Sequence, residues 1–164
     1  MFPERVSGRC TEDQPGLRIR KMTAEDVQAA SVLEAKNFPG DPLTKEMFLL
    51  AVRDMSTVCL CAEVDGAFAA LVIIRTVAGE GNIDNVSVDP VYRRRGIART
   101  LLKEAMRRAR AACGAESFTL EVRVSNREAC ALYASLGFVN EGIRPGYYFN
   151  PREDAYIYWM RNQT

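Results

Sequence analysis

Two long β-patterned segments on either side of Asp65-Gly66 dominate the middle of the chain. Residues 57–64 and 67–77 are apolar and rich in β-branched side chains, and an Asp-Gly pair between two such runs is a strong signal for a two-residue hairpin. A turn at Gly79-Glu80-Gly81 then leads into a third strand pattern at residues 82–88, which ends at Asp89-Pro90. The chain is therefore expected to build its core around a sheet with antiparallel neighbours.

Helical patterns precede and follow these strands. Thr23 and Thr44 have the character of helix N-caps, and residues 96–112 form a long amphipathic pattern closed by Gly114. The apolar residues expected to face inward from the first two helices are Val27, Ala30, Val32, Leu33, Ala35, Met47, Phe48, Leu50 and Ala51. Further strand patterns cover residues 17–21, 117–124, 138–143 and 154–161, with a helix at 126–136 and a loop at 144–150.

The resulting order is β-α-α-β-β-β-α-β-α-β-β, without internal repeats. This order predicts a mixed α/β (α+β) fold, with a central sheet of about six to seven strands flanked by about four helices. The length of 164 residues fits one domain. Residues 1–16 are expected to form a flexible leader, because Pro3, Gly8, Pro15 and Gly16 oppose regular structure, and residues 17–164 the domain.

The composition excludes several classes of chemistry. The chain contains no histidine, so Ser-His-Asp and Cys-His catalysis and histidine-containing zinc sites are ruled out, and no metal is expected. The 22 basic and 21 acidic residues give a net charge of +1, which argues against a nucleic-acid-binding domain. The polar start, the lack of a long apolar run and five cysteines without a C-x-x-C pair predict a cytoplasmic protein without a membrane span.

A basic turn joins the third strand pattern to the long helix. It reads Arg93-Arg94-Arg95-Gly96, and Ala98 and Arg99 follow. A helix start offers unpaired backbone N–H groups and a partial positive charge, and the small residues would let an anion approach the backbone. The stretch fits neither a Walker A loop nor a Rossmann fingerprint. From the residues alone, a phosphate-binding turn and a solvated basic turn both remain open.

Two motifs resemble those of a known family. Arg93-x-x-Gly96-x-Ala98 resembles the Q/R-x-x-G-x-G/A signature with which GNAT acetyltransferases bind the pyrophosphate of acetyl-CoA. Residues 120–138, LEVRVSNREACALYASLGF, closely resemble a block of the ribosomal-protein-alanine acetyltransferases, the RimI-like branch of GNAT. Asn85, with the Val86-Ser87-Val88 that follows, also fits a strand of that branch, and the resemblance runs from about residue 17 to residue 160.

The resemblance implies an enzyme that moves the acetyl group of acetyl-CoA to an amine, with a protein N-terminus, above all ribosomal-protein alanine, as acceptor. It implies Glu121 as general base, Tyr133 as the acid that protonates the departing thiolate, and a main-chain N–H near Val88 as donor to the carbonyl oxygen. The residues it implies for cofactor binding are Val86, Val88, Arg93, Arg94, Arg95, Gly96, Ile97, Ala98, Arg99, Asn126 and Tyr133. Those expected near the acceptor are Phe38, Asn85, Tyr147 and Tyr148.

The chemistry of these side chains agrees with that function. An α-amine has a pKa of about 7.7 to 8.0, so its deprotonation at neutral pH costs only about 1 kcal/mol. A carboxylate acting through a water suffices for this step, and without histidine Glu121 is the candidate. The structural alternatives are an ion pair of Glu121 with Arg123 and a purely packing role for Tyr133.

Three other functions stay open on the sequence. The same fold could acetylate a lysine, a polyamine or another small amine, it could be a catalytically silent acyl-CoA-binding module, or the arginine turn could bind nucleic acid. The loop Phe38-Pro39-Gly40-Asp41-Pro42 also departs from the F-P-W of the RimI-like branch. This departure bears on which peptide the loop would accept.

Overall fold

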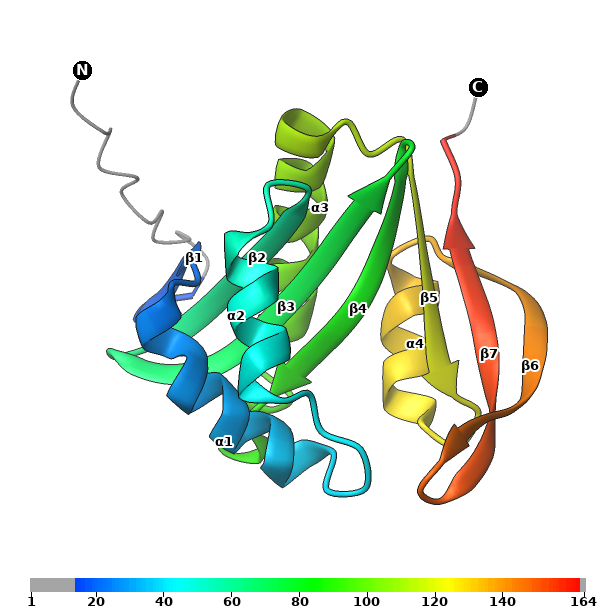
Figure 1. The fold of residues 1–164 in the computed structure, drawn as a ribbon, viewed down its shortest axis with the longest axis horizontal. Coiled ribbons are helices and arrows are strands. Elements are labelled where there is room, and N and C mark those ends of the chain that lie inside the picture. Colours follow the sequence, from blue (N-terminus) through cyan, green and yellow to red (C-terminus); the bar gives the residue numbers. More distant parts are fainter. Residues whose placement is uncertain (1–13, 163–164) are drawn as a thin grey trace.

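The computed structural model describes residues 14–162. They form a seven-stranded sheet in the order β1-β2-β3-β4-β5-β7-β6 (Figure 1). The strands are β1 (Leu17–Lys21), β2 (Thr57–Val64), β3 (Ala67–Val77), β4 (Glu80–Val88), β5 (Ser117–Arg123), β6 (Val139–Phe149) and β7 (Arg152–Met160). The α-helices are α1 (Val27–Asn37), α2 (Lys45–Arg53), α3 (Ile97–Cys113) and α4 (Arg127–Ser135). The predicted element order and fold class are confirmed.

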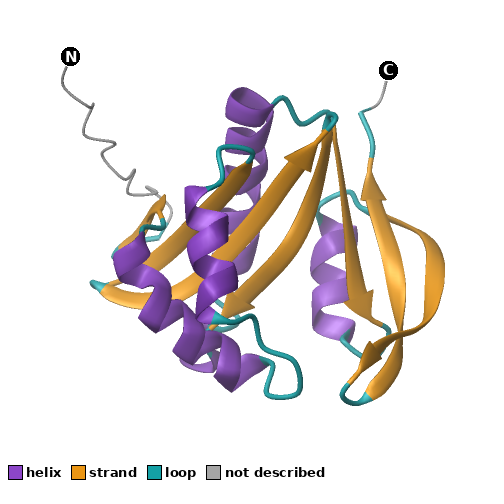
Figure 2. Ribbon diagram, viewed as in Figure 1, coloured by secondary structure: helices purple, strands orange, loops and turns teal. Residues whose placement is uncertain are grey.

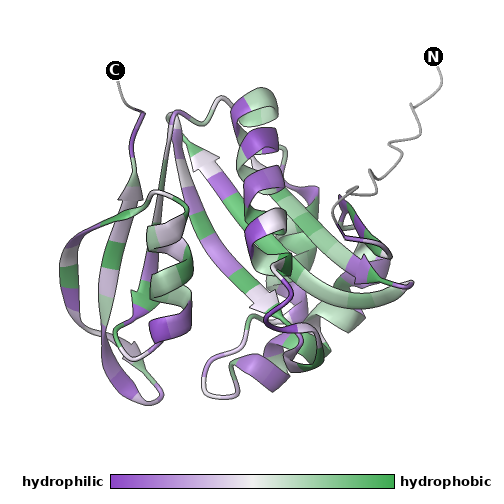
Figure 3. Ribbon diagram, turned by 180° about the vertical axis from the view of Figure 1, so that it is seen from behind, coloured by the Kyte–Doolittle hydropathy of each residue, from purple (hydrophilic) through white to green (hydrophobic). Residues whose placement is uncertain are grey.

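Helices cover both faces of the sheet (Figure 2). α1 and α2 lie on one face, where Leu33 and Phe48 share a buried cluster with Cys59 and Ile73 of β2 and β3. α3 and α4 lie on the other face, which is toward the reader in Figure 3. Because β2 and β3 are covered on both sides, their sequences are nearly continuous apolar runs instead of alternating patterns.

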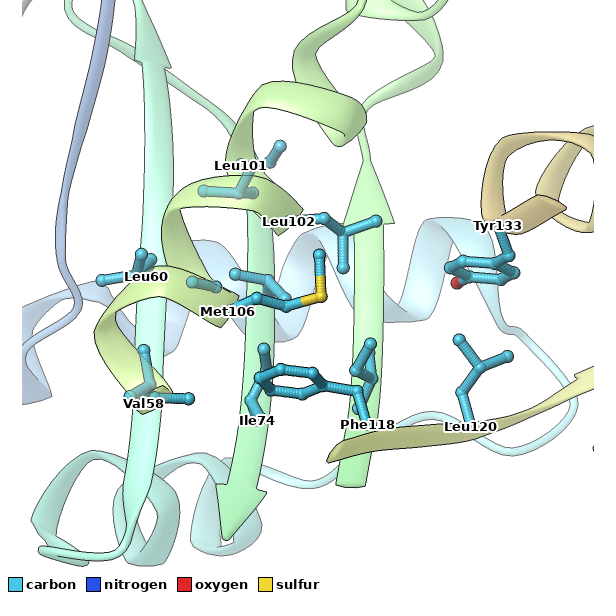
Figure 4. Packing of buried hydrophobic residues seen from close by; sticks show 14 of the residues in the cluster. Val58, Leu60, Ile74, Leu101, Leu102, Met106, Phe118, Leu120 and Tyr133 are labelled. Atoms are coloured by element: carbon cyan, nitrogen blue, oxygen red, sulfur yellow. The ribbon is translucent and has the colours of Figure 1, made fainter. Parts of the chain in front are cut away.

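A second, larger cluster lies under α3 and continues across to α4. Apolar side chains of α3 recur every three or four residues, so they form one stripe along the helix that packs on the sheet. The labelled residues of Figure 4 belong to this cluster: Val58, Leu60, Ile74, Leu101, Leu102, Met106, Phe118, Leu120 and Tyr133. Because the cluster includes residues of β5 and α4 as well as of the preceding strands and α3, it packs these two elements against the rest of the fold.

The inward faces of α1 and α2 are narrower than predicted. Val32 and Leu50 are 57% and 71% exposed, and Ala35 and Met47 are exposed as well. Each helix contacts the sheet along one stripe, and these four residues lie on the opposite side of their helices. The α1 stripe instead contains the buried acid Glu34, 3% exposed, which apolar periodicity did not identify.

The predicted loop at residues 144–150 is wrong, because β6 continues through it to Phe149. β6 is an edge strand that pairs with β7 alone, and its register shifts between Arg144 and Tyr148. An edge strand with such an irregularity can accommodate Pro145 and Gly146, which a central strand could not.

The chain before β1 is described only from Gln14 onward. Gln14 to Gly16 form a turn in which Leu17 N–H donates to the Gln14 carbonyl (3.1 Å) and Asp65 N–H donates to the Gly16 carbonyl (3.0 Å). The rest of the predicted leader, residues 1–13, lies outside the described residues. Within residues 14–162, no helix has both the length and the apolar character needed to cross a bilayer.

Candidate active site

β4 and β5 are parallel neighbours that pair briefly and then separate (Figure 1). Residues 80–82 pair with residues 117–119. Gly81 permits this contact, since a Cβ there would lie 2.6 Å from the Phe118 ring. Beyond it the strands line a cleft of about 1390 Å³. That volume exceeds the range of about 300–1,000 Å³ typical of small-molecule pockets, so it has room for a large cofactor and part of a second substrate.

One part of the cleft is formed by the start of α3. Gly96 precedes the helix with φ +74°, and no side chain in the described part of the chain caps it. The first helical hydrogen bond runs from Thr100 N–H to the Gly96 carbonyl (3.1 Å), which leaves the amides of Ile97, Ala98 and Arg99 without helical partners. All three residues line the cleft. These amides and the helix dipole suit a phosphate group.

The four arginines of the turn have different positions. Arg94 lines the cleft and pairs at 3.5 Å with Glu128, both side chains being largely exposed. Arg99 lines it as well and donates to the Ser135 hydroxyl (2.7 Å). Arg93 also lines it, but its guanidinium is bound to the protein, as described below.

Arg95 does not line the cleft, contrary to the sequence-based expectation. Its guanidinium stacks over the Tyr92 ring at 5.5 Å, and its carbonyl accepts a hydrogen bond from the Gln14 side chain (2.7 Å). Left-handed backbone conformations at Arg94 (φ +63°) and Gly96 (φ +74°) flank this residue, within a turn. The turn therefore directs only part of its positive charge into the cleft.

The N–H of Val88 points toward the cleft. Asp89 N–H donates to the Ala69 carbonyl of β3 (2.8 Å), and successive residues of a strand direct their N–H groups to opposite edges. The Val88 carbonyl likewise faces away from β3, where Asn37 Nδ2 (3.0 Å) and Arg93 Nε (3.2 Å) donate to it. The geometry is thus compatible with the expected donor near Val88.

Glu121 lines the cleft from β5 and pairs with Arg144 Nε of β6 at 3.2 Å. Its side chain is 26% exposed, so solvent reaches it. The alternative pairing with Arg123 is wrong, because Arg123 binds Glu153 (3.1 Å) and the carbonyls of Asn150 and Pro151. Neighbouring odd-numbered residues of β5 share a face, but longer-range partners on β6 and β7 decide their pairing.

Tyr133 both packs in the core and lines the cleft. Its ring contacts Phe138 edge-on at 5.8 Å and Tyr158 at 6.2 Å, and Figure 4 shows it beside Leu120 of β5. Burial, with smaller contributions from Tyr148 and Cys130, raises the pKa of Tyr133 above that of a free phenol. Asn126, at the start of the same helix, caps α4 by accepting from Ala129 N–H (3.2 Å), as predicted, and lines the cleft too.

The residues expected near the acceptor lie on β4, in the loop after α1 and in the β6–β7 hairpin. Phe38, Asn85 and Tyr148 line the cleft as predicted, whereas Tyr147 does not and packs edge-on against Tyr148 at 5.0 Å. The register of β6 is irregular between Arg144 and Tyr148, so strict alternation of side chains does not hold there, and the Tyr147 ring lies beside Tyr148 without lining the cleft. Burial raises the pKa of Tyr148 to about 12.

Glu34 is a cleft residue that sequence reasoning missed. Its carboxylate accepts from Asn85 Nδ2 (2.7 Å) and from Leu43 N–H (3.2 Å), so it joins β4 to the loop after α1. Burial raises the pKa of Glu34, while both hydrogen bonds favour the ionised form. The signal available in the sequence was its position seven residues after Val27, on the buried side of α1.

No group of three or more metal-ligating side chains occurs within residues 14–162.

Comparisons with known proteins give the family of the chain. Residues 24–138 match the Acetyltransferase (GNAT) family. N-alpha-acetyltransferase RimI of Mycobacterium tuberculosis is 34% identical over 151 residues, 89% of this chain and 93% of that protein.

The chain belongs to the GNAT acetyltransferase family.

Two further relatives come from Escherichia coli. The ribosomal protein bS18-alanine N-acetyltransferase of strain K12 is 42% identical over 95 residues, 57% of this chain and 64% of that protein. A crystal structure of the ribosomal-protein-S18-alanine N-acetyltransferase superposes with a TM-score of 0.79 and 31% identity, covering 90% of this chain and 96% of the other. This GNAT chain therefore shares its fold with that enzyme over nearly the whole of its described length.

Proposed function

We propose that this acetyltransferase transfers the acetyl group of acetyl-CoA to the N-terminal α-amine of a protein, with ribosomal-protein alanine as the first acceptor to test. The observation that carries the proposal is a single cleft that holds Glu121, Tyr133 and the cleft-facing edge of Val88 together. Relatives named as bS18-alanine and N-alpha-acetyltransferases support the choice of acceptor. A ribosomal acceptor would place the reaction in the cytoplasm.

The residues present fit acetyl-CoA. The unpartnered amides of Ile97, Ala98 and Arg99 would bind the pyrophosphate, with Arg94 adding positive charge. The rest of the cofactor would lie against four other residues that line the cleft, Val86, Val88, Asn126 and Tyr133. When bound, acetyl-CoA would supply the thioester whose acetyl group is transferred. Arg95, which lies outside the cleft, is not part of this proposal.

The positions of Glu121, Val88 and Tyr133 in the cleft support one role for each in the reaction. Glu121 would take a proton from the acceptor ammonium through a water, so that the free amine forms its new C–N bond to the acetyl carbon. Val88 N–H would donate to the carbonyl oxygen as negative charge develops there. As the C–S bond breaks, Tyr133 would protonate the sulfur, and the second proton that the nitrogen loses on forming the amide would restore the phenol through solvent.

The acceptor side of the cleft is narrowed by a contact between two loops. Gly40, after α1, lies so close to Asn150 of the β6–β7 hairpin that a Cβ on Gly40 would overlap the Asn150 carbonyl. Asn150 Nδ2 also donates weakly to the Gly40 carbonyl (3.4 Å). The acidic lining residues include Glu34, Asp41 and Glu121. These acidic side chains would attract the protonated amine of a chain terminus, as they would that of a lysine or a polyamine, so a direct comparison of these amines decides among them.

Thiol release from acetyl-CoA tests the proposal. Peptides beginning with Ala, Ser or Met would be compared with free lysine and spermidine, and an Ala peptide with a blocked α-amine serves as control. Turnover with the free Ala peptide and none with the blocked peptide is the expected result. Turnover only with lysine or spermidine would overturn the proposed acceptor.

A further inference from the structure

Asn37, the last residue of α1, binds three groups that surround the Val88 position. Its Nδ2 donates to Ser87 Oγ (2.7 Å) and to the Val88 carbonyl (3.0 Å). Its Oδ1 accepts from Arg93 Nη2 (2.8 Å). Both the NH2 group and the oxygen of the amide therefore form hydrogen bonds, which fixes the orientation of the side chain.

Arg93 completes this arrangement from the other side. Its Nε donates to the same Val88 carbonyl (3.2 Å) while its Nη2 holds Asn37. A guanidinium presents its donors in a rigid fork, so the two bonds fix its position as well. We call the side chains of Asn37 and Arg93, together with the two β4 groups that they bind, the Asn37 clamp.

We propose that the Asn37 clamp holds the end of β4 so that Val88 N–H is aimed at the reacting carbonyl, and that Arg93 acts as a positioning residue instead of a phosphate ligand. The inference rests on the proposed function, since it takes Val88 N–H as the donor to the developing oxyanion. N–H and C=O of one strand residue point to the same edge, so fixing the Val88 carbonyl and the buried Ser87 hydroxyl fixes that amide too.

The end of β4 is held by the sheet along one edge only. Beyond residue 82, β4 has no pairing with β5, so its cleft-facing edge lacks the sheet hydrogen bonds that hold an interior strand. Lys36 adds an ion pair to Asp89 at 3.1 Å just past the strand end. An oxyanion donor contributes most when its direction is set before the reaction. Here Asn37, at the end of α1, holds the end of β4 that carries the donor.

Two variants test the proposal against the phosphate-ligand role. Asn37→Ala removes the bonds to β4 and to Arg93, while Arg93→Lys keeps a positive charge that could still bind phosphate but loses the fork. The kcat and the KM for acetyl-CoA would be measured together with the Kd for CoA by calorimetry. Asn140→Ala and Arg53→Lys, at exposed positions that do not line the cleft, are the matched controls.

Both variants are expected to lose about tenfold or more in kcat, with the Kd for CoA changed less than twofold. The double variant should lose no more than the worse single variant, because both changes open the same clamp. An Arg93→Lys enzyme with wild-type kcat, or a loss that appears in the Kd for CoA and spares kcat, would overturn the proposal. Should Asn37→Ala fail to fold, Arg93→Lys at an exposed residue carries the test alone.

The comparison uses whichever amine the wild-type enzyme acetylates. If the alanine peptide is not a substrate, the proposed acceptor fails, and the clamp is still measured with lysine or spermidine. If the peptide is acetylated and the variants show unchanged kcat, the clamp alone fails. The two proposals can therefore fail separately.

Discussion

Tyr133 combines a packing role with a position in the cleft. Its ring belongs to the same buried cluster as Leu120 and Phe138, and the residue also lines the cleft. Packing fixes the ring, and burial keeps the phenol protonated above its ordinary pKa of 10. The two interpretations of Tyr133 that the sequence left open are therefore compatible with each other.

We predict that Tyr133→Phe lowers kcat by about 10²-fold or more, because the ring packing remains and the proton donor is lost. Stability and the Kd for CoA should stay close to those of the wild type. The measurements are steady-state thiol release, thermal unfolding and calorimetry. Tyr156→Phe, a half-buried β7 residue that does not line the cleft, is the control. Unchanged kcat in Tyr133→Phe would leave only the packing role.

Glu121 differs from Tyr133 in being accessible to solvent and paired with Arg144. We predict that Glu121→Gln lowers kcat/KM by about 10²-fold at pH 7. The deficit should shrink as the pH rises past about 8, because the α-amine then loses its proton without help. A pH profile of kcat/KM for both proteins checks this. A deficit that is constant across pH 6.5 to 9.5 would indicate an ion-pair role instead.

At the scale of elements, the junction between β4 and β5 determines the cleft. The Phe118 ring occupies the place where a side chain on residue 81 would lie, and Phe118 itself is fully buried. We predict that Gly81→Ala destabilises the protein by about 1 to 3 kcal/mol through overpacking. Urea unfolding would measure it, with Gly142→Ala as the matched control, since its nearest neighbour would be 3.7 Å away. Equal effects of both variants would contradict the overpacking argument.

α3, whose start is the proposed phosphate-binding site, carries a compact ion-pair network. Glu104 binds Arg107 and Arg108 at 2.7 and 2.8 Å, one turn along. Hydrogen bonds from Arg107 above all, and then from Arg108, lower the pKa of Glu104 to about 2 from an ordinary 4.5, against the opposing effect of burial. Because the folded pKa is the lower one, the stabilisation is present above pH 4.5 and is lost as the pH falls toward 2.

We predict that Glu104→Gln lowers the free energy of unfolding by about 1 kcal/mol at pH 7. The difference from the wild type should be smaller at pH 3, because Glu104 is then mostly protonated in the unfolded chain and most of its contribution to stability is lost. Chemical unfolding at both pH values provides the measurement. A difference that does not change with pH would show that lost packing, and not the charge, accounts for the effect.

At the scale of the whole molecule, β4 pairs with β5 in the sheet, and the loop after α1 contacts the β6–β7 hairpin at Gly40 and Asn150. The first contact is fixed by the buried core, and the second joins two exposed loops. A change at the second contact is therefore expected to alter the proposed acceptor entrance and to leave the proposed phosphate-binding helix start unchanged.

We predict that Gly40→Ala raises the KM for the acceptor peptide by about tenfold, because the added methyl would displace the β6–β7 hairpin by overlap with the Asn150 carbonyl. The Kd for CoA and the thermal stability should change little. Kinetics at saturating acetyl-CoA measure the effect, and Gly142→Ala again serves as the control. A change in CoA affinity without one in acceptor KM would contradict this division of the cleft.

The sequence by itself determined the order of elements and the location of the main motifs. Local patterns suffice for these features: an Asp-Gly turn, a 3.6-residue apolar stripe and a helix start after a basic turn each depend on neighbours within a few residues. Hence the strand order along the chain, the cleft positions of Gly96, Glu121 and Tyr133, and the cap at Asn126 followed from the residues or from the family resemblance.

Only the tertiary structure decided which side chains meet. Glu121 pairs with Arg144, Glu34 binds Asn85, and Asn37 binds Ser87, the last two across 51 and 50 residues of chain. Arg95 lies outside the cleft, between two left-handed residues, with its guanidinium over the Tyr92 ring. Such partners depend on how separate elements approach in space, which local periodicity does not encode, and so the composition of the site was fixed by packing.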